Sequence, residues 1–345
     1  MTGANAADPA ALAQRFLEVC RSRFGADLGL AEAATSVGEG FDTAIAFVHL
    51  RGTALPAEWR RPLVLRIQPH AERLGLARRE ALVQTWCADR SFPAPRVLEV
   101  LAPGELLDVP VQVIERAPGV SMLEALRSAP WRARSLMTRL ADLHLRLHAL
   151  PARDWPIVAD DMTLADRRLA MPRVYVPRLD DTRLARALER AEQIAAELND
   201  GSPSPVVCHG DFHPLNVLID GDEASVIDWT DAALGDRHGD VSRTALLFLV
   251  GGIAAENRAE RVAVKAFGPL LRRRYLRVYQ AGQGLDGGRL RRWEALHCVH
   301  GWTQVVALHA GLLDSEAKPD ANRARVNPRL AHWLAARFDR AAAPV

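Results

Sequence analysis

A short strand followed by a polar loop and a hairpin, in the middle of a mainly helical region, restricts the fold of this chain most. Residues 206–208 (VVC) predict the strand, and the polar loop HGDFHPL follows it. The chain continues with the runs 216–220 and 224–228 on either side of the turn Gly221-Asp222-Glu223. Two apolar runs around a glycine-containing turn are typical of a β-hairpin.

This hairpin predicts that two oxygen-bearing side chains meet. With a three-residue turn, Asn216 lies opposite Asp228, and the Cβ atoms of such partners are about 4.5–5.5 Å apart. A carboxylate and a carboxamide oxygen at that spacing suit Mg²⁺, with phosphate oxygens of a substrate completing the coordination. Asp211, which follows the preceding strand, could orient a hydroxyl group and accept its proton during phosphoryl transfer. The pattern therefore predicts a metal–nucleotide site with a base beside it.

The rest of the chain divides into a strand-rich first third and a helical remainder. Strands are predicted at Thr43–Leu50, Pro62–Gln68 and Asp108–Glu115, and helices at residues 9–25 and 71–89. Further helices are predicted at residues 122–127, 132–150, 181–198 and from 240 to about 340. This order predicts an α+β fold with a small β-rich N-terminal lobe, residues 1–116, and a larger helical C-terminal lobe, residues 117–345.

Composition excludes several classes of function. The net charge of +2 is too small to suggest a nucleic acid as the main partner. The longest apolar window, Thr244–Ala255, is too short to span a bilayer, so no membrane role is expected. The four cysteines form no CxxC pair and the N-terminus lacks the pattern of a secretory signal, which predicts a cytoplasmic protein. The absence of a GxxxxGK[ST] motif argues against a P-loop NTPase.

The motifs of the central segment resemble those of a known family. His209-Gly210-Asp211, then Asn216, then Ile227-Asp228-Trp229 resembles the aminoglycoside phosphotransferase and choline kinase-like family, small-molecule relatives of protein kinases. The resemblance implies a two-lobed, protein-kinase-like fold in which Asp211 is the catalytic base and Asn216 and Asp228 bind Mg²⁺. It also implies that Asp240 ties the catalytic loop to the helix behind it.

The resemblance extends to an ion pair in the first lobe. Arg66 lies where the family has a lysine on a small-lobe strand, and Glu80 on the following helix is its expected partner. An ordinary surface ion pair is the alternative. Arginine keeps the charge of lysine and can bind phosphate through two N–H groups, although its fork is larger than an ammonium group.

Two further segments resemble parts of the family's nucleotide site. Residues 112–119 resemble the hinge whose backbone binds adenine, which implicates Glu115 and Ala117. Residues 36–42 lie at the position of the nucleotide loop. There Gly38 and Gly40 would let backbone amides approach the phosphates.

Other polar residues near the loop have open roles. His209 and His213 are expected to brace the loop by hydrogen bonds rather than to take part in the chemistry. Asp231 and Asp236 are either solvated turn residues or groups that face the acceptor.

Together these features predict a small-molecule O-phosphotransferase that moves the γ-phosphate of ATP or GTP to a hydroxyl acceptor with Mg²⁺. Inactivation of a macrolide- or aminoglycoside-type antibiotic and phosphorylation of a metabolite are both open. The alternative is a catalytically weak nucleotide-binding scaffold, suggested by Arg66 and the loose glycine loop. A protein kinase is disfavoured because no APE-like segment follows Ile227-Asp228-Trp229.

The acceptor itself is not identified by any motif. From residue 241 to the end there are seventeen Arg and Lys residues against eight Asp and Glu, which argues against a polycationic aminoglycoside. Aromatic residues of the same region could stack on a bulky acceptor, cage a choline-like cation or simply lie in the core. These residues are Tyr275, Tyr279, Trp293, Trp302 and Trp333.

Overall fold

The computed structural model describes residues 9–37, 43–157, 162–201, 203–254, 258–313 and 327–343. These form two compact units. Unit 1 contains the described residues up to Gly119 together with Leu218–Thr230, and unit 2 contains Val120–Val217 and the described residues from Asp231 onward. The structure therefore differs from the expectation of one continuous segment per lobe. The reason is that the hairpin packs on unit 1, where the Val226 amide donates to the Pro93 carbonyl at 2.7 Å.

Unit 1 is built on a five-stranded antiparallel sheet in the order β2-β3-β5-β7-β6. The strands are β2 (Thr35–Val37), β3 (Ala44–Val48), β5 (Leu63–Ile67), β6 (Val97–Leu101) and β7 (Val111–Glu115), and a small ladder joins β1 (Gly29–Leu30) to β4 (Leu50–Arg51). The three predicted strands are confirmed as β3, β5 and β7. The short strands β1, β2 and β6 are not predicted, and β6 is half-buried along most of its length, so its side chains show no clear alternation.

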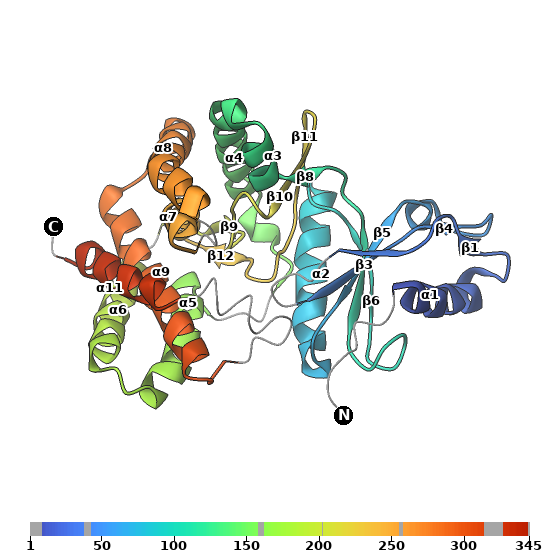
Figure 1. The fold of residues 1–345 in the computed structure, drawn as a ribbon, viewed down its shortest axis with the longest axis horizontal. Coiled ribbons are helices and arrows are strands. Elements are labelled where there is room, and N and C mark those ends of the chain that lie inside the picture. The colour runs from blue at the N-terminus through green and yellow to red at the C-terminus, as the bar shows by residue number, and fades with distance from the viewer. Residues whose placement is uncertain are drawn as a thin grey trace. The chain divides into compact units, whose positions relative to one another are not determined.

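The two faces of this sheet are covered by different helices, α1 (Pro9–Phe24) and α2 (Leu74–Asp89) (Figure 1). Leu63 and Leu65 of β5 belong to the same buried cluster as Phe16 of α1. Because side chains alternate along a strand, Arg66 points to the opposite face, toward α2. Its neighbour in β7, Gln112, donates to the Ala77 carbonyl of α2 at 3.2 Å. The alternation of β5 therefore directs Arg66 toward α2.

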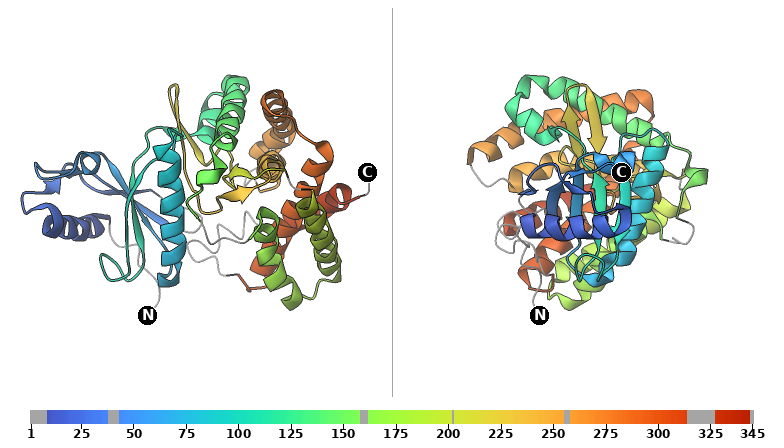
Figure 2. Two further views of the ribbon diagram at one scale, coloured as in Figure 1. Left: turned by 180° about the vertical axis from the view of Figure 1, so that it is seen from behind. Right: turned by 90° about the vertical axis from the view of Figure 1, so that its right-hand side faces the viewer.

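Unit 2 is mainly helical (Figure 2). Its helices are α3 (Met122–Ser128), α4 (Ala133–His148), α5 (Leu164–Tyr175), α6 (Thr182–Asp200), α7 (Arg237–Ala254), α8 (Arg258–Gly282), α9 (Gly287–His309) and α11 (Pro328–Ala341), and a short β8 (Val120–Ser121) precedes α3. The strands β9 (Val206–Cys208) and β12 (Ala233–Gly235) pair in antiparallel fashion. The predicted helices are confirmed, whereas α5, β8 and β12 are not anticipated by the sequence patterns.

The aromatic residues that could have formed an acceptor surface lie in the interior of unit 2. Tyr275, Tyr279, Trp293 and Trp302 are at most 4% exposed, and Trp333 packs partly buried against the core. The core alternative is thus confirmed, and a stacking surface made of these side chains is wrong.

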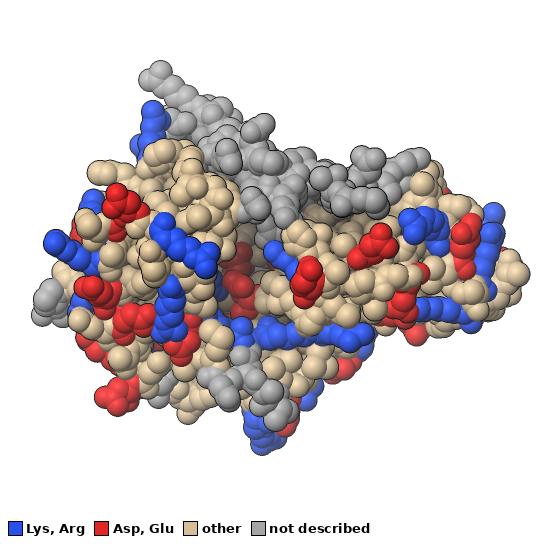
Figure 3. Space-filling model, turned by 90° about the horizontal axis from the view of Figure 1, so that it is seen from below, with Lys and Arg blue, Asp and Glu red and all other residues tan. Residues whose placement is uncertain are grey.

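The surface and the helices of the described residues give two general findings. Within the described part of the chain, no helix combines the length and the apolarity needed to cross a bilayer. On the face shown in Figure 3, acidic and basic side chains are interspersed rather than gathered by sign. This agrees with the small net charge of the sequence.

Candidate active site

The hairpin has a shorter turn than predicted. It consists of β10 (Val217–Asp220) and β11 (Glu223–Val226), so the turn is Gly221-Asp222 alone, with Gly221 at φ +54°. Two-residue turns match the right-handed twist of paired strands, and they need residues that tolerate positive φ. Asn216 and Asp228 lie just outside the two strands. The predicted cross-strand pairing of these two residues is therefore wrong.

Asp228 is instead held by its own neighbours in unit 1. Its backbone has φ +66°, a conformation that residues other than glycine rarely adopt. The next residue, Trp229, is fully buried, donates to the Val226 carbonyl at 3.0 Å and contacts the ring of Phe92 edge-on. Thr230 donates to Oδ1 of Asp228 at 2.9 Å. The buried tryptophan and the threonine thus fix a carboxylate that is 43% exposed.

Arg66 joins this carboxylate to Glu80. Its Nη1 pairs with Glu80, its Nη2 lies 3.1 Å from Oδ1 of Asp228, and its Nε donates to Thr43 at 3.3 Å. Burial alone would lower the pKa of Arg66, but the two carboxylates raise it above its ordinary value. Glu80 is only 1% exposed and also accepts from Gln112. The expected Arg66–Glu80 partnership is present, and the surface ion pair alternative is wrong.

Asp211 lies in the polar loop of unit 2, with a partner on each carboxylate oxygen. Nε and Nη2 of Arg243 are both 3.0 Å from Oδ1, and Nε2 of His213 is 3.1 Å from Oδ2. The Leu215 amide donates to Nδ1 of His213, so the proton of this imidazole is on Nε2 and is donated to Asp211. Burial acts to raise the pKa of Asp211, but Arg243 and His213 outweigh it and hold the pKa well below its usual range. The side chain is 28% exposed.

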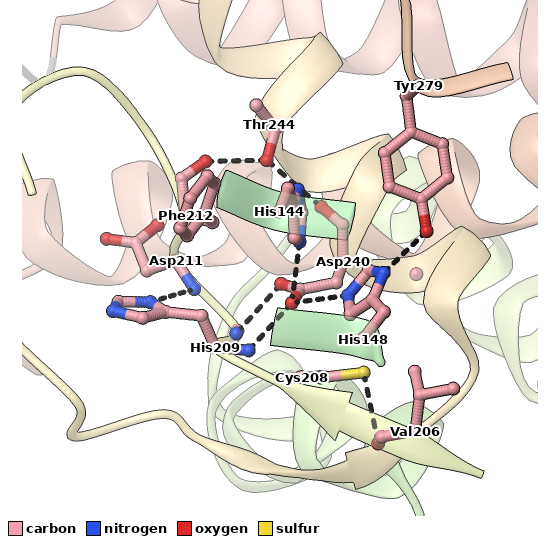
Figure 4. Close-up of polar contacts among 12 residues, drawn as sticks. His144, His148, Val206, Cys208, His209, Asp211, Phe212, Asp240, Thr244 and Tyr279 are labelled. Atoms are coloured by element: carbon pink, nitrogen blue, oxygen red, sulfur yellow. Dashed lines mark hydrogen bonds and ion pairs between the residues drawn. The ribbon is translucent and has the colours of Figure 1, made fainter. Parts of the chain in front are cut away.

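Asp240 anchors the loop from behind (Figure 4). The amides of His209 and Gly210 donate to its two oxygens at 2.7 and 2.8 Å. His144 and His148 of α4 lie 3.0 and 3.3 Å from Oδ2, and because a carboxylate only accepts, each Nε2 carries a proton. Burial acts to raise the pKa of Asp240, but the two histidines lower it well below its usual value. The predicted role of Asp240, tying the loop to the helix behind it, is confirmed.

The two histidines are in turn held by tyrosines of α8. Nδ1 of His144 accepts from Tyr275 at 2.6 Å, and Nδ1 of His148 accepts from Tyr279 at 2.5 Å. Burial and the neighbouring His148 lower the pKa of His144 to about 4. The carboxylate and the imidazoles are close enough to suggest a metal site, but hydrogen bonds already account for every one of these nitrogen atoms. We therefore assign the cluster a structural role.

The expected bracing role of the loop histidines is confirmed. Nδ1 of His209 accepts from the Asp211 amide at 3.3 Å, and His213 holds both Asp211 and the Leu215 amide. Asn216 is 8% exposed and donates through Nδ2 to the Asp211 carbonyl at 3.0 Å. This bond uses the nitrogen of the Asn216 carboxamide and not its oxygen.

Of the two nearby aspartates, Asp236 differs from both of its expected roles, whereas for Asp231 both alternatives stay open. Asp236 is 4% exposed and accepts from Arg289 and Trp293, so it is neither a solvated turn residue nor an acceptor-facing group. Asp231 is half-exposed and pairs with Arg168 at 3.1 Å. Asp231 also explains the glycine of the loop, since a Cβ atom on Gly210 would lie 2.5 Å from the Asp231 carbonyl oxygen.

The residues predicted to bind the nucleotide are only partly described. Glu115 lies at the end of β7, where its amide donates to the Arg96 carbonyl at 2.9 Å and its side chain pairs with Arg61. Ala117 lies two residues beyond the end of β7. Gly38 and Gly40 lie outside the described residues. For these four positions the assignments stay predictions.

Sequence reasoning did not single out Arg243 or Arg168. Arg243 follows Asp240 by three residues on α7, so both side chains point to the same side of the helix, toward the loop. That spacing is a signal that could have found it. Arg168 lies on α5, far away in sequence, and only the tertiary fold brings it to the Gly210 carbonyl at 2.6 Å.

Residues 55–293 match the model of the phosphotransferase enzyme family, and this span contains Arg66, Glu80, Asp211, Asn216 and Asp228. The chain belongs to this family. An aminoglycoside 3'-phosphotransferase from Streptomyces fradiae is 33% identical over 168 residues, which are 46% of this chain and 60% of that enzyme. The similarity thus spans less than two thirds of the relative's length.

Solved structures of family members have the same fold. A thermostable mutant of aminoglycoside phosphotransferase APH(4)-Ia, in ternary complex with AMP-PNP and hygromycin B, has a TM-score of 0.63. It is 19% identical, with 94% of this chain and 97% of that chain covered. A choline/ethanolamine kinase family protein from Mesorhizobium loti has a TM-score of 0.53 at 18% identity, covering 90% of this chain and 94% of the other. The predicted protein-kinase-like fold and the predicted family are confirmed.

Proposed function

We propose that this phosphotransferase family member transfers the γ-phosphate of ATP or GTP to a hydroxyl group of a small molecule, with Mg²⁺ as the metal. The observation that carries the proposal is the state of Asp211. This carboxylate is ionised, partly exposed and held on both oxygens by Arg243 and His213. Such a carboxylate can accept a hydrogen bond from an acceptor hydroxyl and orient it for attack, and in this proposal it receives the proton as the phosphoryl group is transferred.

The residues assigned to the metal have donor atoms that suit Mg²⁺. The bonds from Arg66 and Thr230 to Asp228 both end at Oδ1, so the second oxygen can bind a cation. Asn216 uses its Nδ2 group within the loop, which leaves its carboxamide oxygen as a ligand. Oxygen-only donors favour Mg²⁺ accompanied by substrate phosphates. When bound, the ion neutralises charge on the β- and γ-phosphates.

In this proposal the nucleotide is held by the first lobe. Arg66 binds phosphate oxygens, Glu80 keeps Arg66 in place, the backbone at Glu115 and Ala117 binds the base, and Gly38 and Gly40 lie over the phosphates. The four cysteines are reduced and buried. We place the reaction in the cytoplasm, which keeps thiols reduced.

One observation favours a second candidate, a nucleotide-binding scaffold with little turnover. Arg66 replaces the lysine of the family, and its guanidinium is already engaged by Glu80, Asp228 and Thr43. Binding phosphate then requires exchange of one of these contacts. The intact environment of Asp211 favours the enzyme over the scaffold.

The test is nucleotide consumption with Mg²⁺ across a panel of hydroxyl compounds, with the Asp211→Ala variant as the blank. The panel contains aminoglycosides, macrolides, choline, sugars and nucleosides, each assayed with ATP and with GTP. Acceptor-dependent turnover that is lost in the blank supports the phosphotransferase. Magnesium-dependent nucleotide binding without turnover on any acceptor supports the scaffold, and phosphate transfer to generic proteins would point to a protein kinase.

A further inference from the structure

Any acceptor of this reaction must bring its hydroxyl group to hydrogen-bond distance of Asp211. The charged groups that touch Asp211 and its loop therefore determine the charge that the acceptor meets there. In unit 2 these groups come from two helices and from the chain after the hairpin. Arg243 of α7 contacts Asp211, and Arg168 of α5 contacts both the Gly210 carbonyl and Asp231. His300 of α9 contacts the Arg168 carbonyl at 3.0 Å and not the loop itself.

The two carboxylates at this loop that are partly exposed, Asp211 and Asp231, are already neutralised from within the protein. The third, Asp240, is buried and is fixed by the loop amides. Arg243 contacts Oδ1 of Asp211 through two nitrogen atoms, each at 3.0 Å. Arg168 pairs with Asp231 at 3.1 Å. His300 adds no negative charge, and burial together with the two arginines lowers its pKa to about 4, so it is neutral at pH 7. Two carboxylates and two guanidinium groups leave this cluster without net charge.

Neither arginine is easily displaced by a ligand. The Arg168 side chain is 5% exposed, and the Nη2 group that pairs with Asp231 also donates to the Gly210 carbonyl at 2.6 Å. Arg243 is 21% exposed and extends from the same face of α7 as Asp240, whose carboxylate is fixed by the loop amides. An arginine stays protonated at any accessible pH. The positive charges of Arg168 and Arg243 therefore stay beside the loop at every pH at which the protein is folded.

A polycationic acceptor would have to place ammonium groups beside these arginines. Asp211 and Asp231 are both paired already, so neither carboxylate is left to bind an ammonium group. Like charges repel most strongly where water is partly excluded. Resting on the proposed function, we propose that Arg243 is a specificity-determining residue and that the acceptor is a hydroxyl compound without an ammonium group beside the reacting hydroxyl. A neutral or anionic polyol meets this condition.

The test compares two probes that share their hydroxyl groups. Kanamycin is polycationic, and its fully N-acetylated form is uncharged. Affinity is measured by titration calorimetry on the full chain with Mg²⁺ and a non-hydrolysable ATP analogue. We expect the wild type to bind kanamycin no more tightly than the acetylated form. We expect Arg243→Gln to bind kanamycin at least tenfold more tightly than the wild type, because the negative charge of Asp211 is then uncovered.

Two further variants separate charge from geometry. Arg243→Lys keeps the charge and should retain the weak kanamycin binding of the wild type. Arg186→Gln removes an exposed charge on α6 and should also behave as the wild type. Tighter wild-type binding of kanamycin than of its acetylated form would overturn the proposal. An unchanged kanamycin affinity in a folded Arg243→Gln protein would do so as well.

The proposed function is tested separately in the same samples. Mg²⁺–nucleotide affinity and phosphate transfer report on it, whereas the kanamycin comparison is a binding measurement that needs no turnover. Nucleotide binding without phosphate transfer would contradict the proposed enzymatic function. The kanamycin comparison would still show whether Arg243 disfavours cationic ligands.

Discussion

The carboxylate clusters around Arg66 and around Asp211 differ in charge balance. At Arg66, two carboxylates, Glu80 and Asp228, share one guanidinium group. At Asp211, one carboxylate receives a guanidinium group and an imidazole. The first cluster has an excess negative charge that a divalent cation can neutralise, whereas the second does not. The comparison separates Asp228, the proposed metal ligand, from Asp211, the proposed base, although both residues are aspartates that are partly exposed.

The largest expected effect is on the base. Asp211→Asn keeps the size of the side chain but removes the proton acceptor, so kcat for phosphate transfer should fall by about 10³-fold. The affinity for Mg²⁺–nucleotide should change by no more than about twofold, since the metal is proposed to bind at Asp228 and Asn216 and not at Asp211. Steady-state kinetics and nucleotide titration measure the two quantities. Asp180→Asn, at an exposed position outside both clusters, is the control. Near wild-type turnover of Asp211→Asn would show that the base is assigned wrongly.

The anchor of the loop should matter most for stability. Asp240→Asn removes a buried charge that accepts from two amides and two imidazoles, and the free energy of unfolding should fall by about 3 kcal/mol. The exposed Asp339, which pairs with Arg183, is the matched control, and Asp339→Asn should cost about 0.5 kcal/mol or less. Urea denaturation of both variants measures the difference. An equal loss of unfolding free energy in both variants would mean that the buried contacts of Asp240 stabilise the protein no more than an exposed ion pair does.

The cluster of Arg66, Glu80 and Asp228 should give a smaller change of a different kind. Asp228→Ala should weaken nucleotide binding by about tenfold or more in the presence of Mg²⁺ and change it little in EDTA, because the lost oxygen is the one proposed to bind the ion. Glu223→Ala, at an exposed position of the same hairpin, should bind as the wild type does. An equal loss of nucleotide affinity with and without Mg²⁺ would mean that Asp228 positions Arg66 and does not bind the ion.

The smallest effect is a pH dependence of stability that comes from His144. Its pKa is about 4 in the folded protein, below the ordinary value of 6.5 that we take for the unfolded chain, so between these values the unfolded chain binds the extra proton. The stabilisation is complete above pH 6.5 and is lost as the pH falls toward 4, by at most about 1.4 kcal/mol per pH unit. His144→Gln can still donate to Asp240 and accept from Tyr275. This variant should therefore lose less stability than the wild type between pH 7 and pH 5, as measured by urea denaturation. An identical loss in both proteins would exclude His144 as the source.

Much of this protein follows from local patterns in its sequence. The alternation of β5 places Arg66 on one face and the leucines of the core on the other, and the spacing of apolar residues predicts helices such as α1, α2 and α6. The HGD loop between a strand and a hairpin identifies Asp211 because strands and tight turns are determined by neighbouring residues. These features depend on contacts over a few positions along the chain.

The parts that could not be predicted depend on contacts between distant segments. The shorter turn at Gly221-Asp222 changes the hairpin register by one residue, a change that hydrophobic patterning alone does not resolve. Tyr275 and Tyr279 are buried beside α4, where their hydroxyl groups bond to His144 and His148, more than a hundred residues earlier in the chain.

The sequence by itself thus determined the family, the order of the elements and the candidate base. Only the tertiary structure decided how the charge of that base is balanced. Arg243 and Arg168 reach the loop from separate helices, and a pattern of residues along a chain contains no information on which cation comes to rest on which carboxylate. Ionic contacts act through space and bear no fixed relation to sequence spacing, so the electrostatics of the site belong to the fold.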